Sequence, residues 1–278
     1  MKCENMKRFF ISGCQRSGTT LMRLVLEAHP DVYCYDEQLG YQLLIEEARD
    51  GKSVDRTEGR EKLLGFKIPR YAEQLLRREF DDVDYGKSPS FYYDEPVLFM
   101  VRDPLDTIAS MITLKLPDGM AWIARYGKVI LEHMMHDSVA ASRFGKQYQG
   151  VVAQGEPEHL VGAMYWSIKN QGLLDLVEQG KPVFPIQYES FVSEPEPVLK
   201  EICQFLDVPW CRNLLYHDDH KHGELDEKGL AIGGTNPKRS IDSRSVGRHR
   251  WVLSPLQVSE VKEFSREMLK KLEGVVRR

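Results

Sequence analysis

The sequence predicts an α/β protein in three layers, in which helices cover both faces of a central parallel sheet. Short apolar runs alternate with helical stretches along much of the 278-residue chain, and this alternation is typical of parallel sheets built from strand–helix units. The clearest unit has an apolar strand at residues 9–11, a glycine-bearing turn and then a helix with apolar residues at 3.6-residue spacing. We expect a P-loop-like strand–loop–helix there, and ligands at the carboxyl ends of the strands.

Further strand–helix pairs are expected in order along the chain. The predicted strands are 63–68, 97–101 and 182–187, and the predicted helices that follow them are 71–80, one from Leu105 and 197–206.

The two remaining regions differ in composition. Residues 116–180 are expected to be mostly helical, to flank the sheet and to form part of an acceptor pocket. Residues 217–250 are rich in Gly, Asp, His, Lys and Arg and are expected to form a long functional loop. Ser254 and Pro255 suit the N-cap and first position of a final helix. We expect residues 1–278 to form a single domain.

The first turn, Gly-Cys-Gln-Arg-Ser-Gly-Thr-Thr at residues 13–20, is suited to bind an anion. A turn between a strand and a helix directs backbone N–H groups and the positive end of the helix dipole at one point, which favours a phosphate or sulfate. The glycine spacing is that of a Walker A loop, but Thr19 stands where the lysine would be. Arg16 is then the nearest cation. The alternative is a tight turn without a ligand.

A second candidate anion site lies at residues 97–111. An apolar strand ends at Arg102, and Asp103-Pro104 turns the chain into a helix that carries Ser110. An arginine in this place can form a bidentate pair with a phosphate. The alternative is a purely structural turn between Arg102 and Asp103.

Composition narrows the function classes. A net charge of −4 and a pI near 6.1 argue against general binding of nucleic acids. The chain has no apolar stretch of about 20 residues that could span a membrane and no signal-peptide core. Its cysteines are odd in number and scattered, which favours free thiols in a reducing compartment. We expect a cytoplasmic protein. The cysteines are Cys3, Cys14, Cys34, Cys203 and Cys211.

Three segments, GCQRSGTTLMR, VRDPLDTIASM and SVGRHRW, together resemble sulfotransferases that use 3′-phosphoadenosine-5′-phosphosulfate (PAPS). The resemblance implies that the first turn holds the 5′-phosphosulfate, that Arg102 and Ser110 hold the 3′-phosphate, and that Tyr188 lies near the nucleotide. It also implies a closing loop at 240–248. The implied 5′-phosphosulfate residues are Arg16, Ser17, Gly18, Thr19 and Thr20, and those of the closing loop are Ser245, Gly247 and Arg248.

Residues 16–38 resemble the tyrosylprotein sulfotransferase branch almost position by position, and Lys67 and Tyr188 match it further on. The chain departs from that branch where Gln38 and Leu39 replace basic residues that read an acidic peptide. Leu114 likewise replaces an arginine. The segment 116–157 shows no resemblance.

Sulfuryl transfer needs a general base for the acceptor hydroxyl and cations that stabilise the developing charge. The resemblance implies Glu37 as the base, with Asp36 as the second choice, and Lys67 together with Arg16 as the charge-stabilising groups. Pro69 stands where cytosolic small-molecule sulfotransferases have a histidine base, which favours Glu37. The alternative for Glu37 is a solvated acidic loop. The leaving group is the nucleotide phosphate, so no metal is required.

Other interpretations stay open. The segment HDDHKH at 217–222 contains metal-ligand residue types, but their adjacency favours a solvated loop. Four apolar residues could line an acceptor pocket or belong to the core: Trp122, Tyr126, Met134 and Met135. The competing functions are a P-loop small-molecule kinase, which Thr19 disfavours, and a non-catalytic nucleotide-binding module. The acceptor could be a small molecule, a carbohydrate or a peptide hydroxyl, and the sequence does not indicate an oligomeric state.

Overall fold

The computed structural model describes residues 7–50, 62–69, 95–116, 118–136 and 138–276. A five-stranded sheet in the order β2-β3-β1-β4-β5 forms its centre, and every pair of neighbouring strands is parallel. The predicted three-layer α/β architecture with a parallel sheet is confirmed. The strands are β1 (Lys7–Gly13), β2 (Val32–Tyr35), β3 (Leu63–Lys67), β4 (Val97–Val101) and β5 (Val183–Gln187).

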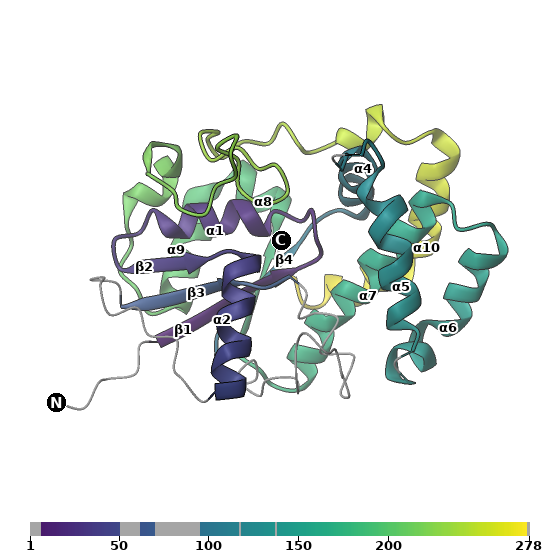
Figure 1. The fold of residues 1–278 in the computed structure, drawn as a ribbon, viewed down its shortest axis with the longest axis horizontal. Helices are drawn as coiled ribbons and strands as arrows, with labels where there is room; N and C mark the ends of the chain where they lie inside the picture. Colours follow the sequence, from purple (N-terminus) through teal and green to yellow (C-terminus); the bar gives the residue numbers. More distant parts are fainter. Residues whose placement is uncertain (1–6, 51–61, 70–94, 117, 137, 277–278) are drawn as a thin grey trace.

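The sheet is largely buried on both faces, and β3 and β4 are buried along their whole length. Alternate residues of a strand point to opposite faces. Phe9 and Ile11 therefore pack with α1 (Thr19–Glu27) and α9 (Pro195–Phe205), whereas Phe10 packs with helices of the opposite layer. That layer contains α2 (Glu37–Asp50), α7 (Glu158–Glu178) and α10 (Pro255–Glu273). Figure 1 shows α1, α8 and α9 gathered along one side of the sheet.

The region from 116 to 180 is mostly helical, as expected, and stands beside the sheet (Figure 1). Met134 lies in the core, and Trp122 and Met135 pack against it, while Tyr126 is exposed. Of the two interpretations of these four residues, acceptor pocket or core, packing in the core therefore holds for three of them. The helical elements here are η2 (Ile123–Gly127), α5 (Lys128–Met134), α6 (Ser138–Ala153) and α7.

The long loop near the carboxyl end is built of turns and short 3₁₀ segments. It is followed by α10, whose N-terminus is a capping box between Ser254 and Gln257, with Pro255 at the first position. The remaining elements are α4 (Pro104–Thr113), α8 (Tyr188–Ser193), η3 (Arg212–Asp219) and η4 (Arg248–Trp251).

Strand β2 and helix α2 are among the elements that the sequence pattern did not predict. Strand β2 lies at the sheet edge and α2 begins at Glu37, so Glu37 is the first residue of a helix. The helix expected at 71–80 lies outside the described residues.

Candidate donor and transfer site

The turn between β1 and α1 has the backbone of a tight anion-binding loop. Gly13 (φ 134°) and Gly18 (φ 94°) adopt conformations that side-chain-bearing residues rarely adopt, and Arg16 (φ 73°) is also left-handed. A Cβ on Gly13 would lie 2.4 Å from the carbonyl oxygen of Met100, and one on Gly18 would lie 2.5 Å from Cδ2 of Tyr188. Both glycines are therefore required by close packing as well as by their torsion angles.

The two predicted anion sites meet at one place. The Arg16 Nε donates a hydrogen bond to Ser110 Oγ at 3.1 Å, and Arg102 Nη1 donates to the Arg16 carbonyl oxygen at 2.9 Å. The guanidinium of Arg102 also stacks 4.5 Å from the ring centroid of Tyr188. The carboxyl ends of β1 and β4 are neighbours in the sheet, which brings these groups together.

A cavity of about 260 Å³ opens between these groups and the carboxyl-terminal loop. Its wall contains Arg16, Arg102 and Arg248, together with hydroxyl groups and glycines from both segments. All the predicted donor residues line the cavity except Ser17, which is buried, and Gly247, which lies in the closing turn. The residues of the wall include Gly18, Thr19, Thr20, Ser110, Tyr188, Arg239, Ser240 and Ser245.

The electrostatics of the cavity favour an anion. Burial, with the charges of Arg102 and Arg248, lowers the pKa of Arg16 to about 10. Arg16 is still cationic at neutral pH, so its charge lies close to those of Arg102 and Arg248 on the wall of a small cavity, which also contains Asp242. Arg102 Nε is buried and has no hydrogen-bond partner within the described parts of the chain. An anion in the cavity would relieve both conditions.

The closing turn is held by Asp106, a residue that the sequence analysis did not select. Its carboxylate accepts hydrogen bonds from the backbone N–H of Gly247 at 2.7 Å and of His249 at 2.9 Å. Burial would raise the pKa of Asp106, but the hydrogen bonds from His249 and Gly247 outweigh burial and lower it. Arg102 Nη2 also donates to the carbonyl oxygen of Ser245 at 2.6 Å. The turn with Ser245 and Arg248 is thereby fixed over the cavity.

The predicted transfer residues lie next to this cavity. Lys67 Nζ is 3.5 Å from Glu37 Oε2 and donates to Thr20 Oγ1 at 3.3 Å. Lys67 is almost fully buried, and burial lowers its pKa although Glu37 and Asp36 oppose the shift. Thr20 lines the cavity, so it connects the donor loop to the Lys67–Glu37 pair.

Asp36 and Glu37 have different surroundings. Asp36 is buried, and its Oδ1 accepts a hydrogen bond from the backbone N–H of Gln38 at 2.9 Å. Glu37 has its carboxylate beside Lys67 and is partly accessible. A general base must reach the acceptor hydroxyl, which favours Glu37 over Asp36.

Two of the histidines at 217–222 have partners within the protein. His222 Nδ1 lies 2.8 Å from Glu27 Oε2, and its Nε2 lies 2.8 Å from the carbonyl oxygen of His217. Both rings are buried, whereas Asp219 and Lys221 are exposed, so the segment is only in part the solvated loop that adjacency suggested. Contacts with α1 account for the burial of the rings: His222 meets the Glu27 carboxylate, and the apolar residues of η3 pack in the same core cluster as α1.

Comparisons with known proteins agree with the site. Residues 8–88 match a model of the sulfotransferase family. Protein-tyrosine sulfotransferase 1 of Danio rerio is 21% identical over 94% of this chain and 66% of its own length. A putative protein-tyrosine sulfotransferase of Caenorhabditis briggsae is 22% identical over 96% of this chain and 85% of its own. The chain spans only 41% of the Drosophila melanogaster protein-tyrosine sulfotransferase.

Solved structures share the fold. The sulfotransferase domain from the curacin biosynthetic pathway aligns with a TM-score of 0.57 at 18% identity, covering 94% of this chain and 97% of that domain. A mouse sulfotransferase complexed with PAP aligns with a TM-score of 0.52 at 15% identity, covering 95% and 85%. The resemblance drawn from the motifs is confirmed.

The expected location is wrong. The protein-tyrosine sulfotransferases that this chain resembles are membrane-anchored enzymes of the Golgi, which contradicts a cytoplasmic assignment. In the part of the chain that the structure describes, every helix is too short or too polar to span a lipid bilayer. The cytoplasmic expectation rested on the odd number and the spacing of the cysteines. Such a pattern does not determine the cellular compartment.

Proposed function

We propose that this chain, which resembles the sulfotransferases that it matches, moves a sulfuryl group from PAPS to an acceptor hydroxyl. The observation that carries this proposal is the meeting of Arg16, Ser110 and Arg102 at one cavity beside the Lys67–Glu37 pair. The cavity suits the donor because it offers cations from two loops, which can bind two separate anionic groups. It draws on segments from both ends of the chain, which supports a single domain.

In the proposed reaction, Glu37 accepts the proton of the acceptor hydroxyl, and the oxygen attacks the sulfur of the donor. The bond between sulfur and the bridging oxygen breaks, and its electron pair stays on the 5′-phosphate. Lys67 and Arg16 stabilise the negative charge that develops on the bridging oxygen and the sulfuryl group. The products are a sulfated acceptor and adenosine 3′,5′-bisphosphate.

Arg102 and Ser110 bind the 3′-phosphate in this scheme. Residues 16–20 bind the 5′-phosphosulfate through backbone N–H groups at the start of α1 and through the Arg16 side chain. Tyr188 and the turn with Ser245, Gly247 and Arg248 close over the nucleotide. The reaction as written needs no metal.

The first acceptor to test is a peptide tyrosine, since the relatives are named protein-tyrosine sulfotransferases. Gln38 and Leu39 provide no positive charge beside Glu37, so we propose that acidic residues around the tyrosine contribute little to acceptor binding. A small phenol or a carbohydrate hydroxyl is the competing acceptor. The kinase alternative gains no support from the relatives or the fold.

The test combines binding and turnover. Adenosine 3′,5′-bisphosphate should raise the melting temperature by mass action, and AMP or ATP should raise it far less. Donor labelled with ³⁵S should then transfer label to a member of a panel of tyrosine peptides, phenols and saccharides, read by mass spectrometry. Equal stabilisation by AMP, or phosphate transfer from ATP with Mg²⁺, would refute the proposal.

A further inference from the structure

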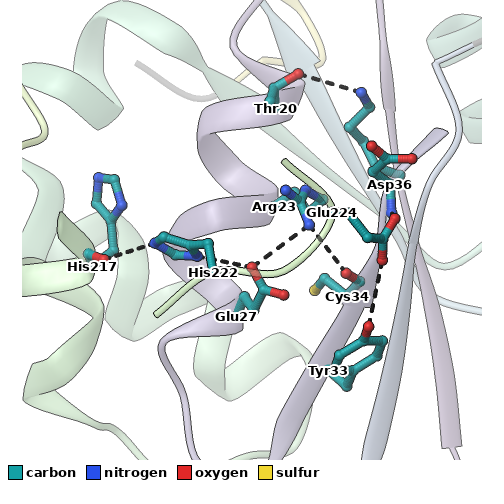
Figure 2. Close-up of polar contacts among 10 residues, drawn as sticks. Thr20, Arg23, Glu27, Tyr33, Cys34, Asp36, His217, His222 and Glu224 are labelled. Carbon is teal, nitrogen blue, oxygen red and sulfur yellow. Dashed lines mark hydrogen bonds and ion pairs between the residues drawn. The ribbon is translucent and has the colours of Figure 1, made fainter. Parts of the chain in front are cut away.

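A carboxylate from the distant loop reaches the turn that carries the proposed base. Glu224 Oε2 accepts a hydrogen bond from the backbone N–H of Asp36 at 3.0 Å, and Glu224 Oε1 accepts one from the Tyr33 hydroxyl at 3.4 Å. Figure 2 shows the Glu224 side chain between Asp36 and Tyr33. The contact joins residues 188 positions apart in the sequence. Asp36 is directly followed by Glu37, so Glu224 holds the backbone immediately before the base.

The backbone of Glu224 is itself constrained. Its φ is 53°, in the left-handed region that residues other than Gly and Asn rarely adopt. Such a conformation persists only where the surrounding structure imposes it. In Glu224, the residue with this backbone conformation is also the one whose side chain accepts the hydrogen bond from Asp36.

One further contact, from His222 to Glu27, fastens the segment before Glu224 to α1. His222 lies between Glu27 of α1 and the carbonyl oxygen of His217, at 2.8 Å from each (Figure 2). Arg23, fully buried one turn before Glu27, lies 3.6 Å from the Glu27 carboxylate. The segment is thus fixed on α1, the helix that begins at the donor loop.

We propose that Glu224 is a positioning residue, which holds the Asp36–Glu37 turn so that the Glu37 carboxylate faces Lys67 and the acceptor. The proposal rests on the proposed function, because the turn matters for sulfuryl transfer only if Glu37 is the base. Glu224 connects the long loop at 217–250 to the acidic turn after β2. Glu224 is not among the residues that line the donor cavity.

The charged and titratable groups around Glu224 support this role. Asp36 lies on the adjoining turn, Tyr33 and Cys34 lie on β2, and Arg23 lies on α1. Burial raises the pKa of Glu224 to about 7, and the Asp36 carboxylate adds to this rise, while the amide of Asp36 and the charge of Arg23 oppose it. The group is therefore partly protonated near pH 7, and an oxygen of either form can accept the hydrogen bond from the Asp36 N–H. A glutamine should then replace Glu224 with little loss.

The kinetic test compares Glu224→Ala, Glu224→Gln and the control Glu227→Ala, which removes an exposed glutamate from the same loop. We expect Glu224→Ala to lower kcat on the order of tenfold to a hundredfold, because a small misplacement of a reacting group has an effect of this size. The KM for the donor should change less than about twofold. Glu224→Gln should keep kcat within about threefold, and Glu227→Ala should behave as the parent chain.

A second measurement does not depend on activity. Hydrogen exchange of the Asp36 amide, read by mass spectrometry or NMR, should be slow in the parent chain and in Glu224→Gln, and about tenfold faster or more in Glu224→Ala. Equal exchange and equal kcat in Glu224→Ala and Glu227→Ala would overturn the proposal while the proposed function stands. If the parent chain transfers no sulfuryl group, accelerated exchange still establishes that Glu224 fixes the turn, and unchanged exchange refutes it.

Discussion

Replacing Arg102 by lysine tests whether the cavity contains a 3′-phosphate site. The Arg102 guanidinium already donates Nη1 to the Arg16 carbonyl oxygen at 2.9 Å and Nη2 to that of Ser245 at 2.6 Å. Its Nε is buried without a partner in the described structure, so this N–H is available to an anion. A lysine ammonium keeps the charge but does not reproduce the planar arrangement of donors.

The loss of nucleotide affinity expected for Arg102→Lys follows from these contacts. Lysine retains the charge but loses at least one charge-assisted hydrogen bond to the phosphate, which contributes about 1.5–3 kcal/mol. The dissociation constant of adenosine 3′,5′-bisphosphate should therefore rise about 10- to 150-fold. The dissociation constant of AMP, which lacks the 3′-phosphate, should change little. The preference for the bisphosphate over AMP should fall by the same factor.

Isothermal titration calorimetry measures both constants on each variant. The matched control is Arg266→Lys, an exposed arginine on α10 that pairs with Glu263. Arg266→Lys should bind both nucleotides as the parent chain does. The reasoning is refuted if Arg102→Lys binds the bisphosphate within twofold of the parent chain, or if it loses the bisphosphate and AMP by equal factors.

Three further changes have defined outcomes. Glu37→Gln should lower kcat on the order of a hundredfold and leave donor affinity intact, whereas normal turnover would exclude Glu37 as the base. Gly18→Ala places a Cβ 2.5 Å from the Tyr188 ring at φ 94° and should lower the free energy of unfolding in urea by about 1–3 kcal/mol; an unchanged midpoint would contradict the packing argument. Burial lowers the pKa of His217 from 6.5 to about 4, so the folded state resists protonation. This contribution to stability is complete above pH 6.5 and is lost as pH falls towards 4. His217→Asn should flatten that part of a melting-temperature profile, and an identical slope would show that His217 does not contribute.

The local parts of the site could be predicted from the sequence. The Gly13–Gly18 turn and the Arg102–Ser110 unit each lie within a short segment. Their glycines indicate the backbone conformation, and their arginines indicate the positive charge. The structure places Arg16 and Arg102 at one cavity because β1 and β4 are neighbours in the sheet.

Strand β2 and helix α2 were not predicted because their signals are weak. The strand has the four residues Val32–Tyr35 and pairs only with β3 among the described strands. A strand this short at a sheet edge depends on its partner more than on its own residues. Only the structure therefore shows that Glu37 lies at the start of α2.

The sequence alone determined the class of fold, the two turns proposed to bind anions and the resemblance to sulfotransferases, because each depends on neighbouring residues whose types set the backbone conformation and the chemistry. Tertiary structure decided the contacts of Asp106 with Gly247 and of Glu224 with Asp36, which join positions 141 and 188 residues apart. It also decided that Thr20 meets Lys67. A carboxylate in a loop looks the same in the sequence whether it is solvated or buried against a distant amide, and only the packing of the whole chain distinguishes the two.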